Sequence, residues 1–233
     1  MSVFISKQLT VPSLGKALSD YAVGESVFLN VNGTLKEFLV VHQGLPSSAY
    51  DNSCDGTWLL MKDIYETKAM DAGNSNDYAA SDMHIYLNGT FLGLFDAKVQ
   101  NTIKQAKIPY TKGTGSAGTV TTGADGLSTK IFLLTFTEIG LTIKSTSYVR
   151  EEGAVLDYFN GAENAKRLGY FNGSALQWWL RSPQKNSSQH FQMTNLTGTA
   201  STAYANVTTW GVRPCIILPF NTKFDPDTNE VIA

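Results

Sequence analysis

The sequence predicts an α+β fold in which two short helices pack on an antiparallel sheet and long loops join the elements. An Asn-Gly pair at residues 32–33 lies between two apolar runs, a pattern typical of a β-hairpin because both residues tolerate positive φ. Two one-sided helical patterns follow in the middle of the chain. The last third combines apolar strands with a long polar stretch. These observations favour one large domain over residues 21–233.

The first part of the chain supplies the hairpin, one buried strand and both helices. The hairpin spans residues 27–41, and the run at residues 57–61 is short and apolar enough for a core strand. The first helix is capped by Ser81 or Asp82 and ends at Asn-Gly. The second starts at Asp96 and ends before Pro109, because the residue preceding proline disfavours the α region.

The later segments are expected to alternate between loops and regular secondary structure. Residues 111–129 are rich in Gly, Thr and Ser and are expected to form a long surface loop, and a strand follows at residues 130–134. A short helix is expected around residues 155–159. The strands at residues 175–181 and 212–218 then frame a polar insert. Within it, Phe, Met and polar residues alternate, so we expect His190, Gln192 and Thr194 to face water.

Composition and charge exclude several classes of partner. The formal net charge is -2 and the basic residues are scattered singly, which argues against nucleic acid. The first residues lack a signal-peptide pattern and no apolar run reaches the ~18 residues of a membrane span, so we expect no membrane insertion, and synthesis and folding in the cytoplasm. Residues 1–20 are expected either to dock onto a larger assembly or to form a helix of the same domain.

Candidate groups for catalysis and metal binding are few. Cys54 and Cys215 are expected to be buried thiols, with a single bridge as the alternative, so no catalytic residue is assigned. The three histidines lie in different elements and lack metal-ligand spacing, which predicts no metal site and no cofactor. Calcium stays open as an alternative, because Asp residues occur in the turns at residues 125–126 and 225–227.

Two motifs carry a resemblance to a known family. WWLRSP at residues 178–183 is followed by GVRP at residues 211–214, and residues 38–42 and 50–60 match as well. Over about residues 24–220 the chain resembles an uncharacterised domain family of gut Gram-positive bacteria and their prophages. That family is similar in pattern to the C-type-lectin-like folds of formylglycine-generating enzymes and of the variable proteins made by diversity-generating retroelements. The resemblance implies a C-type-lectin-like fold with two helices on a twisted antiparallel sheet.

The polar insert between the two framing strands is the expected recognition surface. Small polar residues combined with tyrosine are typical of adaptable binding surfaces. Adjacent tryptophans in a strand point to opposite faces, so one of them is expected to face the loop side, although both packing in the core is an open alternative. The expected ligand-binding residues are Trp179, Gln184, Asn186, Ser188, His190, Gln192, Thr194, Asn195, Tyr204, Asn206 and Trp210.

The sequence therefore favours a non-enzymatic receptor-binding domain of a phage or prophage tail, located in the virion after assembly. The expected ligand is a host surface protein or a glycan, neighbouring tail or baseplate components are expected partners, and a homotrimer would suit a tail tip. Two alternatives stay open: an enzyme of the formylglycine-generating type that uses Arg181, Arg213 and Glu138, and a structural baseplate or decoration protein. The insert's composition also fits diversification by a retroelement.

Overall fold

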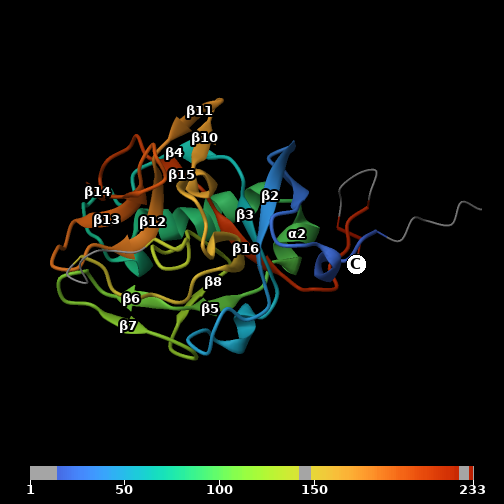
Figure 1. Cartoon of the computed structure of the whole chain (residues 1–233), viewed down its shortest axis with the longest axis horizontal. Helices are drawn as coiled ribbons and strands as arrows, with labels where there is room; N and C mark the ends of the chain where they lie inside the picture. Colours follow the sequence, from blue (N-terminus) through green and yellow to red (C-terminus); the bar gives the residue numbers. More distant parts are fainter. Residues whose placement is uncertain (1–14, 142–147, 226–230, 233) are drawn as a thin grey trace, which may run out of the picture.

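The chain is mostly β in a computed structural model that describes residues 15–141, 148–225 and 231–232 (Figure 1). The main sheet has five strands, all antiparallel, and its central strands β3 and β16 are buried on both faces. In spatial order these are β1 (Ser26–Val31), β2 (Thr34–Gln43), β3 (Thr57–Met61), β16 (Cys215–Leu218) and β9 (Ile131–Phe132).

A second five-stranded sheet carries the polar insert. Its strands pair antiparallel except for β12 and β15, which run parallel. In spatial order they are β14 (Ala200–Tyr204), β13 (His190–Thr194), β12 (Trp178–Pro183), β15 (Gly211–Val212) and β4 (Glu66–Thr67). Because β15 leads directly into β16, one segment of chain joins the second sheet to the main sheet.

Three two-stranded ribbons and short helical segments complete the described fold. The ribbons pair β5 (Ala106–Ile108) with β8 (Leu127–Thr129), β6 (Tyr110–Lys112) with β7 (Thr119–Thr121), and β10 (Gly169–Phe171) with β11 (Ser174–Leu176). The helix α1 (Asp82–Tyr86) continues through a wide turn at Leu87–Phe91 and a tight turn at Leu92–Leu94, and α2 is Ala97–Thr102. Single tight helical turns lie at Leu18–Asp20, Asn52–Cys54, Tyr78–Ala80, Asp157–Phe159 and Asn164–Arg167.

The expected α+β, C-type-lectin-like arrangement of two helices packed on a sheet is wrong. Strands hold 35% of the described residues and helices 17%, and one helical stretch of 13 residues is the main helix. The second expected helix stops at Thr102, and β5 lies at the end of its expected range. The expected loop at residues 111–129 contains β7, β8 and part of β6, because threonine and valine favour extended backbone and pair in short ribbons.

The main sheet separates two hydrophobic clusters. Successive residues of β3 point to opposite faces, so Leu59 enters one cluster and Leu60 the other. The adjacent tryptophans of β12 behave in the same way: Trp179 packs in the first cluster and Trp178 in the second. Both are 0% exposed, so neither faces the loop side.

The two ends of the described chain lie together. Ala17 forms a bridge with Lys223, and Leu18 is buried in the first cluster and donates its backbone N–H to the Thr222 carbonyl at 2.9 Å. Residues 15–20 therefore pack on the domain, while residues 1–14 of the expected N-terminal segment lie outside the described residues. No helix in the described part of the chain is long and apolar enough to cross a membrane.

Candidate functional site

The polar insert folds into the hairpin β13–β14 at the edge of the second sheet. Its register places His190 opposite Tyr204 and Gln192 opposite Thr202 on one face, which we call the β13–β14 face. Phe191 lies on the other face, which packs against the first hydrophobic cluster. The apolar face therefore fixes the hairpin on the core, and the other face leaves Thr202 and Tyr204 of β14 exposed.

An aromatic pair stands at one end of the β13–β14 face. Tyr204 is 49% exposed, and its ring centroid lies 4.0 Å from that of the half-buried His190. Thr202, two residues along the same strand, is also exposed. Tyrosine buries a large area on binding at a low entropic cost, and its hydroxyl can hydrogen-bond a partner. The pair is consequently suited to anchor a polar ligand.

The loop that precedes β13 is held by one buried amide, Asn76. Its Nδ2 donates to the carbonyls of Ser187 at 3.1 Å and His190 at 2.8 Å, and its backbone N–H donates to the Ser188 carbonyl at 2.9 Å. Its Oδ1 accepts from the Gly115 N–H at 2.9 Å. Asn76 is 0% exposed, so it connects three segments that are far apart in sequence. The loop before β13 is therefore pre-organised.

Gly115 allows this close packing. A Cβ at this position would lie 2.0 Å from the carbonyl oxygen of Gln184, so another residue would push the loop away. Sequence reasoning missed both Asn76 and Gly115. Each lies in a polar, turn-like stretch without periodicity, and local patterns carry no information on contacts between distant segments.

A shallow groove runs beside the hairpin. Its cavity volume is about 310 Å³, and it is lined by Phe136, Tyr148, Gln184, Gln192, Ala200, Ser201 and Thr202. The side chain of Gln192 donates to the Tyr148 carbonyl at 3.4 Å, which joins the groove's two walls. Tyr148 itself is 53% exposed. The described residues of the lining combine amides, hydroxyls and aromatic rings, and none of them is charged.

The structure divides the expected ligand-binding residues into three sets. The exposed ones are Asn186, Ser188, Tyr204 and Asn206; the half-buried ones are Gln184, His190, Asn195 and Trp210; the buried ones are Trp179, Gln192 and Thr194. The expectation that Gln192 and Thr194 face water is wrong, because they are 3% and 0% exposed. The indole N–H of Trp179 donates to the Lys68 carbonyl at 2.8 Å, which fixes that ring inside the fold.

The side chain of Asn195 stabilises the turn between β13 and β14. Its Oδ1 accepts from the backbone N–H groups of Thr197 and Thr199, each at 3.0 Å, and its Nδ2 donates to the Thr199 hydroxyl at 2.6 Å. These bonds occupy the side chain locally. Asn195 therefore shapes the hairpin turn, while the outward residues of the face are supplied mainly by β14 and the loop before β13.

The residues of the enzyme alternative lie in the interior. Arg181 and Glu138 are both 0% exposed and form a bidentate pair, with the shorter contact at 2.6 Å between Nη2 and Oε1. Arg181 also donates to the carbonyls of Leu133 and Pro109. Arg213 donates its Nε–H to the Met61 carbonyl at 2.9 Å, and burial lowers its pKa to about 10. These groups order backbone segments inside the fold.

The two thiols are free and buried. Burial is the main cause that raises the pKa of Cys54 to about 12, and it also raises the pKa of Cys215. Both remain protonated at neutral pH, which makes them poor nucleophiles. Within the described ranges, no group of three or more His, Cys, Asp or Glu side chains is placed to hold a metal ion.

The chain matches a known family over residues 55–220, more than half of its length, and that family is described as a domain of unknown function (DUF6273). The chain belongs to this family. The expectation of an uncharacterised domain family is confirmed. The matched range contains β3 to β16, with both framing motifs and the whole β13–β14 face. None of the curated proteins or solved structures matches the chain.

Proposed function

We propose that this chain is a non-enzymatic binding domain that presents the β13–β14 face to a ligand on a host cell surface. The observation that carries the proposal is the pairing of exposed Tyr204 with half-buried His190 on a hairpin whose apolar face is fixed on the core. Preorganised surfaces lose little conformational entropy on binding, and exposed tyrosines are effective anchors. The uncharged groove beside the hairpin offers amides and hydroxyls for a polar ligand.

The proposed ligand is a host surface protein or a glycan, and the proposed setting is the tail of a phage or prophage. The burial of Arg181 and Glu138 supports a non-enzymatic function, because the groups of the enzyme alternative are engaged with each other. The exposed Tyr204 ring beside the exposed polar residues Ser188 and Thr202 supports recognition over simple solvation.

An array experiment with matched variants tests the proposal. The full chain is applied to glycan and host-surface-protein arrays with and without calcium, and the retained ligand is then titrated. Tyr204→Ala should weaken binding at least about tenfold, because a buried tyrosine anchor contributes ~2 kcal/mol or more to an interface. Tyr170→Ala is the control, since Tyr170 is 43% exposed on β10 outside the face, and it should bind like the wild type.

Two results would contradict the proposal. One is retention of ligand by Tyr204→Ala at wild-type affinity. The other is that no ligand is retained on the arrays, while light scattering shows that the chain forms an oligomer whose subunit contacts cover the β13–β14 face. The second result would favour a structural baseplate or decoration protein, in which the same face makes subunit contacts.

Diversification of the insert by a retroelement is a further part of the proposal. Ser188 and Asn206 are exposed, so other side chains at these positions would leave the core intact. The hypothesis requires a near-identical template copy of the coding stretch for residues 184–210 nearby in the genome. Sequencing the flanking DNA tests it, and a region with neither a template copy nor a reverse transcriptase excludes it.

A further inference from the structure

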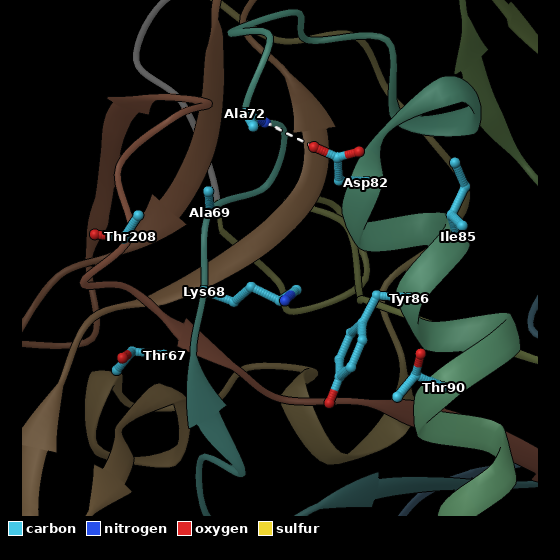
Figure 2. Close-up of a pocket in the computed structure, with 9 residues that line it drawn as sticks. All are labelled: Thr67, Lys68, Ala69, Ala72, Asp82, Ile85, Tyr86, Thr90 and Thr208. Carbon is cyan, nitrogen blue, oxygen red and sulfur yellow. Dashed lines mark hydrogen bonds between the residues drawn. The ribbon is translucent and has the colours of Figure 1, made fainter.

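A second cavity, of about 570 Å³, lies beside the main helix and shares no lining residue with the groove of the β13–β14 face. Figure 2 shows its walls: the segment after β4 on one side, the helix that starts at Asp82 on the other, and Thr208 beyond. The lining residues include one ammonium, one carboxylate, one phenol and three threonine hydroxyls. These groups can donate hydrogen bonds to a polar ligand and accept them from it.

Lys68 is the cation of this cavity. Its ammonium lies 4.6 Å from the centroid of the Tyr86 ring, and Figure 2 shows the side chain extended across the cavity toward that ring. Among the described residues, no carboxylate oxygen lies within 4.0 Å of the Lys68 ammonium, so none of them forms an ion pair with it. The ring therefore positions the ammonium without neutralising its charge.

The backbone around Lys68 is fixed from both sides. Its N–H donates to the Trp210 carbonyl at 3.1 Å, and its carbonyl accepts the indole N–H of Trp179 at 2.8 Å. Trp179 is fully buried, so Lys68 is attached to the rigid part of the second sheet. The ammonium is consequently presented at a defined place.

Hydrogen-bonding groups line both parts of the cavity: Thr90 and Asp82 lie on the helix side with the ammonium, and Thr67 and Thr208 lie on the other side of the segment that carries Lys68. The exposed residues Thr67, Thr90 and Thr208 supply hydroxyls that can donate or accept. Asp82 uses Oδ2 to accept the Ala72 N–H at 2.9 Å, the bond drawn in Figure 2, which leaves its other oxygen as an acceptor. Ile85 is 64% exposed and adds an apolar surface at the rim.

We propose that this cavity binds an acidic sugar unit, a hexuronate or a similar carboxylated monosaccharide within a glycan. Lys68 pairs with the sugar carboxylate, Thr90 and Asp82 take the ring hydroxyls, and Ile85 packs against a C–H face of the ring. A carboxylated sugar fits better than a phosphate, because Asp82 repels a dianion more strongly than a monoanion and accepts hydrogen bonds from the sugar hydroxyls. The site is separate from the β13–β14 face and does not depend on its function.

The test titrates the full chain with glucuronate, galacturonate, glucose and inorganic phosphate, followed by saturation-transfer NMR and calorimetry at low salt. We expect saturable binding of a hexuronate that is at least about tenfold tighter than that of glucose and that weakens as salt is added. Lys68→Met and Lys68→Gln should each reduce hexuronate binding at least about tenfold. Lys98→Met, which removes an exposed lysine on α2, should leave it unchanged.

The outcomes separate this site from the β13–β14 face. Tyr204→Ala should retain hexuronate binding, because Tyr204 does not line the cavity. Equal binding of glucose and hexuronate, wild-type affinity in both folded Lys68 variants, or stronger binding of phosphate would each overturn the proposal. Circular dichroism confirms that the variants compared are folded.

Discussion

Arg181→Met tests whether the buried ion pair holds the interior together. The variant keeps a long side chain but removes both hydrogen bonds to the Glu138 carboxylate. Among the described residues, the carboxylate then retains the Tyr50 hydroxyl at 2.9 Å and the Thr135 N–H at 2.8 Å, and the carbonyls of Leu133 and Pro109 lose a donor. Removing one partner of a buried pair typically costs ~3–5 kcal/mol, because an uncompensated charge is left inside.

The expected loss is therefore about 4 kcal/mol in the free energy of unfolding. For a chain of this size each kcal/mol corresponds to ~2–4 °C in melting temperature, so the variant should melt about 8–16 °C lower. Urea unfolding at neutral pH, followed by the fluorescence of the four tryptophans, measures the free energy directly.

A surface pair provides the matched control. Lys62 and Glu37 also form a contact of 2.9 Å, but Lys62 is exposed, so Lys62→Met should cost ~0.2–1 kcal/mol. The double variant Arg181→Met with Glu138→Gln should be more stable than Arg181→Met alone, because it no longer buries an unpaired charge. A loss below about 1 kcal/mol for Arg181→Met, or a double variant less stable than the single one, would refute the reasoning.

Three further predictions concern other buried groups. Asn76→Ala removes two hydrogen bonds to carbonyls of the loop before β13 and one from the Gly115 N–H. We expect this variant to weaken ligand binding by the β13–β14 face at least about tenfold even at temperatures where it is fully folded. Unchanged affinity in a titration would exclude a positioning role for Asn76. Burial raises the pKa of Glu152 above 4.5, so folding favours its protonated form. The free energy of unfolding of the wild type relative to that of Glu152→Gln should therefore be highest below pH 4.5 and should fall as the pH rises through the raised pKa. Urea unfolding of both proteins at several pH values measures this difference, and a difference that does not change with pH contradicts the prediction. Cys54 and Cys215 should not react with a thiol reagent at about pH 8 until urea is added, and rapid labelling of the folded chain would show that their burial is incomplete.

The parts of the fold that the sequence predicts correctly depend on local signals. Asn32 and Gly33 adopt φ values of 52° and 72°, and they close the expected hairpin between β1 and β2. The predicted core strand coincides with β3, Thr57–Met61. Ser81 caps α1 as expected, since its side chain accepts the His84 N–H. Turn and cap chemistry involves residues within a few positions of each other, so it is visible in the sequence.

The errors arise where distant segments decide the structure. Ile103 leaves the helical conformation with a ψ of 123°, and the chain then forms β5 because residues 127–129 are available as a partner. The alternation in β13 correctly placed Phe191 against the core. It did not show that Gln192 would also be covered, because Tyr148, which shares the groove with it, lies more than 40 residues away in sequence.

The bridge between Ala17 and Lys223 holds both ends of the described chain on the side of the domain away from the β13–β14 hairpin. In Figure 1, residues 15–20 and the C-terminal end lie at one end of the long axis, while β13 and β14 lie at the other. A tag, bead or neighbouring polypeptide joined at either end would sit remote from the hairpin. Immobilisation on a sensor surface through either end should therefore leave the hairpin free, and pulling on both ends would load the main sheet before the hairpin.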